Sequence, residues 1–309
     1  MCPEPHEILK RKHPLGCNMG AKEDFMTRVN DLYRFQAIQG HLGWDQETIM
    51  PAKGAKARGE ILAWLAGQRH TRLIDVEMGS LIQELEQSEH DEYFSANLKE
   101  MRRKYDEAVK LPTEFVSEFT KVRSEALLAW QQARSKSDFS HFAPHLQKLI
   151  DLTHKKIEYL GCEHTPYDVL LDEYEVGMTV GDYDPLFSGL KARLVPLLAR
   201  IMESGTEIPR LPEDMVFPAD AQEKFCNKVS RAMGFDFEAG RMDRSTHPFC
   251  AGLWPDDTRF TTRFDEKDPF SCLYAVMHES GHGVYEQGLP SNYTYSPVGE
   301  AVSLGVHES

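Results

Sequence analysis

The amino-acid sequence predicts a mainly α-helical fold with one small antiparallel β element. Apolar residues recur at three- and four-residue spacing along most of the 309 residues, which is the period of an amphipathic helix. Only residues 240–264 depart from this pattern, and Gly252, Trp254 and Pro255 punctuate that stretch. No internal repeat or low-complexity linker divides the chain, so we expect a single helical domain over residues 21–309, preceded by a poorly ordered tail over residues 1–20.

The helical pattern divides into segments separated by polar or glycine-containing turns. In the first segment Phe25, Val29 and Leu32 fall on one face, and Gly161 suits the end of the sixth because glycine tolerates the left-handed cap. In chain order the predicted helices cover residues 25–43, 56–67, 73–87, 92–109, 113–135, 140–160, 183–203 and 220–233.

The β element is predicted from strict alternation over residues 258–264. Thr258, Phe260, Thr262 and Phe264 form one face, and Thr261 lies between two arginines on the other. This strand is expected in a small antiparallel sheet beside the helix that follows it. A sheet edge can hold a peptide through main-chain hydrogen bonds, and a solvated hairpin is the alternative interpretation.

The next helix is predicted over residues 269–287 from its start and stop signals. Asp268 can cap its N-terminus and Pro269 suits the first helical position, whereas Gly288 suits a left-handed C-terminal cap and Pro290 prevents continuation. Its expected buried stripe comprises Phe270, Leu273, Val276, Met277, Val284 and Tyr285.

This helix carries His278, Glu279 and His282 in the pattern H-E-x-x-H. Positions i and i+4 share one helix face, so the two imidazoles can bind one zinc ion there. Glu279 then lies close enough to the ion to activate its water, and we expect it to act as general base. The alternative is a structural helix with two polar histidines on its exposed side.

A further helix is predicted over residues 298–309. Ser296 and Pro297 repeat the start signal of a capping residue followed by proline. The intervening residues leave room for a turn and a loop, so this helix can return antiparallel to the H-E-x-x-H helix.

A catalytic zinc site needs a third protein ligand and one open position. Glu308, 26 positions after His282, is the best candidate because the returning helix would bring it back to the histidines. Spacing alone also allows Glu300 or His307, and His307 could equally lie behind a ligand rather than bind the metal.

These motifs together resemble those of the Taq-type, or thermostable, metallocarboxypeptidases. His278-Glu279-Ser280-Gly281-His282 and His307-Glu308-Ser309 are similar to that family's H-E-x-G-H and H-E-S pair. Two upstream stretches, His247-Pro248-Phe249 and Asp257-Thr258-Arg259-Phe260-Thr261, resemble its H-P-F and D-x-R-x-T signatures. Residues 44–51, WDQETIMP, are similar to its W-D-x-E-T-x-M-P block. The likeness therefore runs through most of the chain.

The resemblance implies a zinc-dependent metallocarboxypeptidase that removes C-terminal amino acids from peptides. It makes His278, His282 and Glu308 the metal ligands, with zinc as the ion and cobalt as a possible substitute. It also implies a homodimer. Family members are considerably longer than this chain, and their later motifs have no match here, so we expect a domain truncated at its C-terminus. The alternative function is a truncated, non-catalytic helical module that binds a metal or a partner.

Four further residues are candidates for binding substrate or supporting the ligands. The resemblance puts His247 near the metal, and Thr261 belongs to the D-x-R-x-T signature. Asp257 and Arg259 are two positions apart on one strand face, so either they form a structural ion pair or Arg259 faces the substrate. Trp44 and its neighbours carry no evident chemistry and are expected to pack.

Composition excludes several other classes of function. The formal net charge is −14, which argues against nucleic-acid and anionic-membrane partners. No stretch approaches 18 apolar residues and the first residues lack an apolar signal region, so no membrane span or secretory signal is predicted. The six cysteines show no C-x-x-C pairing and fit reduced thiols. We therefore expect a cytoplasmic protein acting on peptides.

Overall fold

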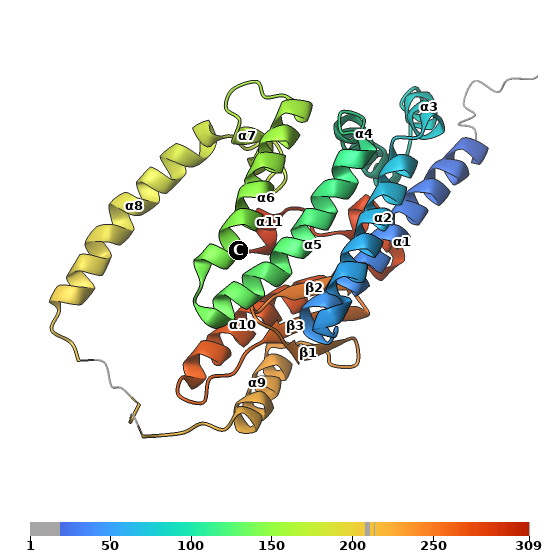
Figure 1. Cartoon of the computed structure of the whole chain (residues 1–309). Helices are drawn as coiled ribbons and strands as arrows, with labels where there is room; N and C mark the ends of the chain where they lie inside the picture. Colours follow the sequence, from blue (N-terminus) through green and yellow to red (C-terminus); the bar gives the residue numbers. More distant parts are fainter. Residues whose placement is uncertain (1–18, 208–210, 213, 309) are drawn as a thin grey trace, which may run out of the picture.

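A computed structural model describes residues 19–207, 211–212 and 214–308 of the chain. It confirms a mainly helical fold with one small sheet (Figure 1). The helices are α1 (Met19–Thr48), α2 (Ala55–Leu73), α3 (Val76–Leu85), α4 (Glu92–Ala108), α5 (Thr113–Lys136), α6 (Phe139–Leu160), α7 (Asp168–Leu171), α8 (Val180–Glu203), α9 (Ala219–Met233), α10 (Pro269–Gln287) and α11 (Leu304–His307). Single 3-10 turns are η1 (Ala52–Gly54), η2 (Ser291–Tyr293) and η3 (Pro297–Gly299), and the strands are β1 (Gly240–Arg244), β2 (Cys250–Trp254) and β3 (Asp257–Thr262).

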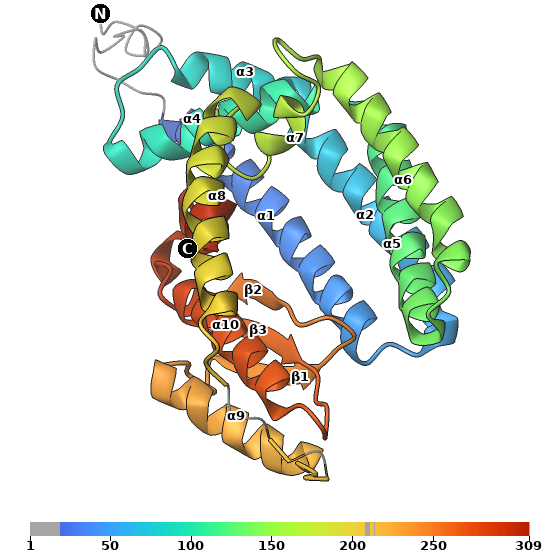
Figure 2. The same ribbon diagram turned by 90° about the vertical axis from the view of Figure 1, so that its left-hand side faces the viewer.

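Four long helices, α1, α2, α5 and α6, pack in sequence as one layer (Figures 1 and 2). At one end of α1 its apolar face meets α3 and α4, as the helical spacing of Phe25, Val29 and Leu32 predicts. These three residues are buried there with Met78 of α3 and Met101 of α4. This core fixes the direction of α1, whose other end reaches the sheet.

The small sheet lies beside α10, in the strand order β1-β3-β2. The β2–β3 pair is antiparallel as expected, but the β1–β3 pair is parallel, so the sheet is mixed. Thr258, Phe260 and Thr262 are buried as the alternation predicts, and Thr261 on the opposite face is buried too. The central strand is therefore covered on both faces, which a solvated hairpin would not be.

A second core joins the sheet to α9 and α10. Phe260 of β3 and Val276 of α10 are fully buried in it with Cys226 and Cys272. The Sγ atoms of Cys226 and Cys272 lie 3.8 Å apart, and both cysteines are free thiols. Because α10 is held against β3 in this way, the position of the H-E-x-x-H residues is set by a packed core.

The N-terminus of α10 matches the sequence prediction, whereas its C-terminus differs from it. Asp268 accepts a hydrogen bond from the Ser271 amide at 3.2 Å, and Pro269 is the first helical residue. The left-handed conformation that the sequence predicts for Gly288 is wrong: its φ of −83° and ψ of −7° are right-handed. Its amide already bonds the Val284 carbonyl at 3.0 Å, so the helix end needs no left-handed residue.

The buried face of α10 also differs from the predicted apolar stripe. Phe270 and Met277 are exposed, whereas Val276 is buried together with Glu279 and His282. The face turned to the core is therefore partly polar, because it carries the motif.

The predicted helix over residues 298–309 is wrong. The segment forms the single turn η3, then an extended Glu300, then the four-residue helix α11. Ser303 caps α11 by accepting from the Val306 amide at 3.2 Å, and the Leu304 amide donates to the Tyr174 carbonyl at 3.1 Å. These tertiary contacts replace the continuous helix and still return the chain to α10.

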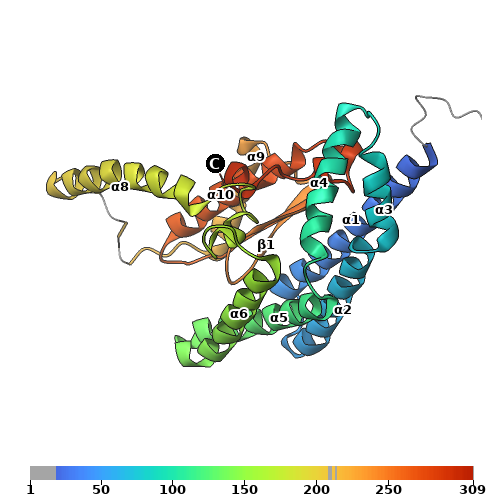
Figure 3. The same ribbon diagram turned by 90° about the horizontal axis from the view of Figure 1, so that it is seen from above.

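The start of α1 and the whole of α8 lie at the periphery of the molecule. Helix α1 begins at Met19, so Met19 and Gly20 are helical rather than part of the predicted tail; residues 1–18 lie outside the described residues. Helix α8 has no buried residue and projects away from the other helices (Figure 3). No helix among the described residues is long and apolar enough to cross a membrane.

Candidate metal centre

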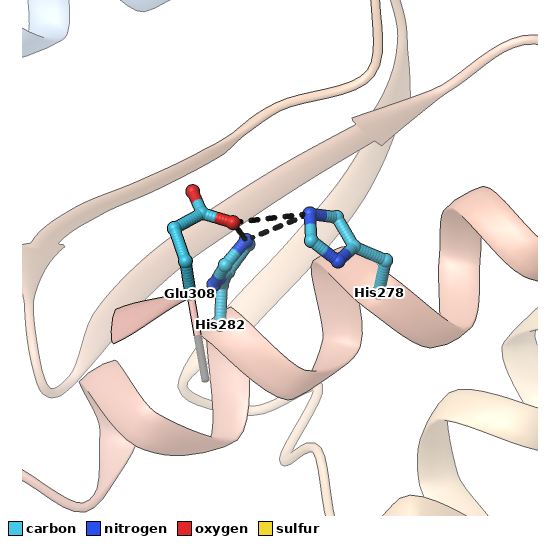
Figure 4. Close-up of side chains that lie close together, drawn as sticks. All are labelled: His278, His282 and Glu308. Atoms are coloured by element: carbon cyan, nitrogen blue, oxygen red, sulfur yellow. Dashed lines mark hydrogen bonds and ion pairs between the residues drawn. The ribbon is translucent and has the colours of Figure 1, made fainter. Parts of the chain in front are cut away.

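The two histidines of the H-E-x-x-H motif lie one turn apart on α10 and point toward the same spot (Figure 4). His282 is rooted in the core with a side chain 8% exposed, whereas the His278 side chain is 55% exposed. Their Nε2 atoms lie 3.0 Å apart. Two ring nitrogens at this distance need either a shared proton or a cation between them.

Glu308 completes a group of three potential ligands with these histidines. Its Oε2 atom lies 3.6 Å from His278 Nε2 and 3.5 Å from His282 Nε2 (Figure 4). Tetrahedral coordination with metal–ligand bonds of roughly 2.0–2.2 Å separates neighbouring ligand atoms by roughly 3.3–3.6 Å. The two distances to Glu308 match this geometry, and the 3.0 Å between the histidine nitrogens is shorter than it. The three donor atoms are thus gathered closely enough to share one small divalent ion, and the exposure of His278 and Glu308 leaves the outer side open.

His282 is oriented by a backbone group of α11. Its Nδ1 atom lies 2.9 Å from the carbonyl oxygen of His307. A carbonyl oxygen only accepts, so Nδ1 carries the proton and the Nε2 lone pair is free to bind a metal. The His307 ring also stacks on the His282 ring, with centroids 4.4 Å apart and planes 3° from parallel.

Glu279 is buried between the two histidines in sequence, with only 5% of its surface exposed. Burial, with a smaller contribution from the Glu308 charge, raises the pKa of the Glu279 carboxyl to about 7. This carboxyl can therefore take up or release a proton near neutral pH, as a general base requires.

The other spacing candidates for a third ligand lie elsewhere. Glu300 accepts hydrogen bonds from Tyr33 and Gln36, and its carboxylate lies 3.0 Å from Lys104 Nζ. It thus ties the segment after η3 to α1 and α4. His307 supplies its carbonyl and ring to His282, and its imidazole is not in the group of three.

The upstream candidates form supporting structure around β3. Arg259 makes a two-point ion pair with Asp257, at 2.6 and 2.8 Å, and its guanidinium lies 5.8 Å from the ring of Trp44. Trp44 is buried and meets Phe249 edge-on at 5.3 Å. Three of the sequence motifs thus pack against one another and join α1 to the sheet.

Ser245, in the turn between β1 and β2, links Thr261 of β3 to the backbone of His247. The Thr261 hydroxyl oxygen lies 2.6 Å from the Ser245 hydroxyl and accepts from the Phe249 amide at 3.1 Å. Ser245 in turn donates to the His247 carbonyl oxygen at 2.6 Å. The His247 side chain itself is exposed, and it is not in the group of three.

Sequence reasoning missed Glu286, one turn beyond His282 on α10. Its side chain is 16% exposed, and its Oε1 atom lies 3.0 Å from His307 Nε2. Burial, together with the Glu300 charge, raises the pKa of the Glu286 carboxyl to about 7. The spacing puts residues 278, 282 and 286 on one helix face, but it does not show that Glu286 is packed against His307.

An H-E-x-x-H helix with a third donor close to both histidines is the arrangement of a metallopeptidase site. The sequence profile of the Carboxypeptidase Taq (M32) metallopeptidase family matches residues 24–309. The chain therefore belongs to the Carboxypeptidase Taq (M32) family, and membership implies a divalent metal ion.

Individual relatives agree with this assignment. The chain is 38% identical over 279 residues to thermostable carboxypeptidase 1 of Thermus thermophilus, a match that covers 86% of this chain and 55% of that protein. The BsuCP crystal structure superposes with a TM-score of 0.90 at 30% identity, covering 93% of this chain and 58% of that one. Metallocarboxypeptidase 1 of Trypanosoma cruzi gives 0.81 at 34%, covering 94% and 59%. The chain thus spans little more than half the length of these relatives.

Proposed function

We propose that this chain is a zinc-dependent metallocarboxypeptidase that removes C-terminal amino acids from peptides. The observation that carries the proposal is the group of His278, His282 and Glu308, whose donor atoms all lie within 4.8 Å of one another, in a chain of a metallocarboxypeptidase family. Two imidazole nitrogens and one carboxylate form the donor set of several catalytic zinc sites, and cobalt would fit the same set. By family membership we also propose a homodimer that works in the cytoplasm.

The three proposed ligands differ in burial, which suits a site that must both hold an ion and admit a substrate. His282 is buried and its tautomer is fixed, whereas His278 and Glu308 face the open side where a peptide would approach. A divalent ion bound here would supply Lewis acidity, which lowers the pKa of a water molecule and polarises a carbonyl oxygen.

Glu279 would move the protons of the reaction. It can take the proton of the attacking water and pass it to the leaving amino group. Its burial keeps it largely out of solvent. The bidentate pair of Arg259 with Asp257 supports an architectural role for both, so we do not assign Arg259 to the substrate.

Replacing the base while keeping its shape tests this function. Glu279→Gln should retain zinc but lose at least about a hundredfold in release of the C-terminal residue from a blocked dipeptide, which is the lower end of general-base catalysis. The same dipeptide with an amidated C-terminus is the control for exopeptidase action and should not be cleaved.

Three outcomes would count against the proposal. A Glu279→Gln variant with more than about a hundredth of the parental rate would show that Glu279 is not the base. Equal cleavage of the amidated dipeptide would indicate an endopeptidase. Stoichiometric zinc without turnover by the parental chain would favour the alternative, a non-catalytic metal-binding module.

A further inference from the structure

Glu286 and His307 form a contact behind the candidate ligands. Both side chains are mostly buried, at 16% and 13% exposure, and Glu286 Oε1 lies 3.0 Å from His307 Nε2. The ring nitrogen makes no well-aligned hydrogen bond with any described residue, so the Glu286 carboxyl is the polar group it faces. Leaving a buried ring nitrogen without a polar partner is unfavourable, so this contact favours one position of His307.

His307 contacts one proposed ligand, His282, and is the neighbour in the chain of another, Glu308. Its carbonyl oxygen accepts the Nδ1 proton of His282 at 2.9 Å, and its ring stacks on the His282 ring. Tyr285 adds an edge-on contact to the His307 ring at 5.2 Å. A shift of His307 would therefore disturb both the orientation of His282 and the placement of Glu308.

We propose that Glu286 is a positioning residue of the metal centre, which holds His307 and thereby sets the affinity for a divalent ion. The inference rests on the metal site of the proposed function, though not on catalysis. Partners behind metal ligands typically change metal affinity by about 10- to 100-fold when they are removed.

The Glu286 carboxylate occupies the space that a side chain at Gly252 of β2 would fill. A Cβ atom added at Gly252 would lie 2.1 Å from Glu286 Oε2, so any side chain there would displace the carboxylate. The φ of Gly252 is not positive, so alanine fits the backbone itself. Both residues line a cavity of about 420 Å³, into which a displaced carboxylate could move. Gly252→Ala therefore moves Glu286 without changing any charge.

The test measures zinc affinity by competition with a chromophoric chelator, and the visible absorption spectrum of the cobalt-loaded chain. Glu286→Ala and Gly252→Ala should each raise the zinc Kd by about 10- to 100-fold and alter the cobalt spectrum, which reports ligand geometry. Glu286→Gln keeps a hydrogen-bonding end group and should lose less than Glu286→Ala. If Glu286→Ala fails to fold, Gly252→Ala carries the test.

Glu300→Gln is the matched control, because Glu300 lines the same cavity but bonds Tyr33 and Lys104 instead of His307. It should leave the zinc Kd and the cobalt spectrum near those of the parental chain. Unchanged zinc affinity in both Glu286→Ala and Gly252→Ala, or an equal loss in Glu300→Gln, would overturn the inference while leaving the proposed function intact. A parental chain that binds no zinc would overturn both.

Discussion

Two buried carboxyl groups on one face of α10 dominate the chemistry at the scale of single residues. Glu279 and Glu286 are two helical turns apart, and burial raises the pKa of each to about 7. A nearby acid, Glu308 or Glu300, adds to the rise in each case. In the metal-free chain both groups therefore hold a proton to much higher pH than an ordinary glutamate.

The raised pKa of Glu286 predicts a pH-dependent stability. Its folded-state pKa of about 7 exceeds the ordinary value of 4.5, so its favourable contribution is complete below 4.5 and is lost as the pH rises through 7. Glu286→Gln cannot ionise. In chelator, the free energy of unfolding of the parental chain relative to this variant should fall by roughly 1 to 3 kcal/mol between pH 5 and pH 8.

Urea denaturation at several pH values measures this difference. Comparing the two chains cancels the groups they share that do not contact Glu286. The pKa of His307, which does contact it, is lowered by burial, so His307 acts in the opposite direction and is followed separately in both chains by NMR titration. A difference in stability that stays constant from pH 5 to pH 8 would show that the Glu286 carboxyl is not perturbed.

Much of the candidate site could be predicted at this scale, because its information is local. The H-E-x-x-H spacing alone puts His278 and His282 on one face of a helix. The hydrogen bond from His282 to the His307 carbonyl could not be predicted, because every residue type has a backbone carbonyl. The role of Glu286 depends on its burial against His307, which spacing does not reveal.

At the scale of elements, the four residues of α11 bring Glu308 to α10. So short a helix has little stability of its own, and it depends on Ser303 at its start and on the bond to the Tyr174 carbonyl. Ser303→Ala should therefore cost about 1 kcal/mol locally, and it should weaken zinc binding several-fold by loosening Glu308.

A cap on a helix remote from the metal provides the comparison. Asp75 caps α3 by accepting from the Glu77 amide at 2.8 Å, so Asp75→Ala should lower the unfolding free energy by about 1 kcal/mol without changing zinc affinity. Isothermal titration with zinc and urea denaturation distinguish the two effects. Equal zinc affinity in Ser303→Ala and the parental chain would show that α11 is held by other contacts.

The elements were predictable where local periodicity governs them. The first eight predicted helices each overlap an observed one, since each carries an apolar face or a clear boundary. Residues 298–309 have the start signal of a helix. Glu300 instead takes an extended conformation and bonds with α1 and α4, so the helix is interrupted there. Strand β1 carries no alternating pattern, and its parallel pairing with β3 depends on tertiary contacts that the sequence does not show.

At the scale of the whole molecule, α8 stands out because it does not pack into a hydrophobic core. No residue of α8 is buried, and its exposed large apolar side chains are Leu186, Phe187, Leu190, Leu194, Val195, Leu197, Leu198, Ile201 and Met202. Patches of this kind mark surfaces of interaction or association. We expect the chain to self-associate with rising concentration, as measured by sedimentation velocity.

Two substitutions on α8 locate this association. Leu194→Glu together with Leu198→Glu should shift the sedimenting species toward the monomer, because like charges would be brought together on an apolar face. Zinc affinity should be unchanged. An undiminished assembly in the double variant would place the association on another surface.

The central claim is that His278, His282 and Glu308 together hold one divalent ion, and elemental analysis of zinc-loaded protein tests it most directly. We predict one zinc per chain in the parental protein and in His247→Ala, whose exposed side chain lies outside the group of three. We predict close to none in His278→Ala, His282→Ala and Glu308→Ala, because each variant removes one of the three ligands proposed among the described residues. One zinc per chain retained in any of these three variants would contradict the claim for that residue.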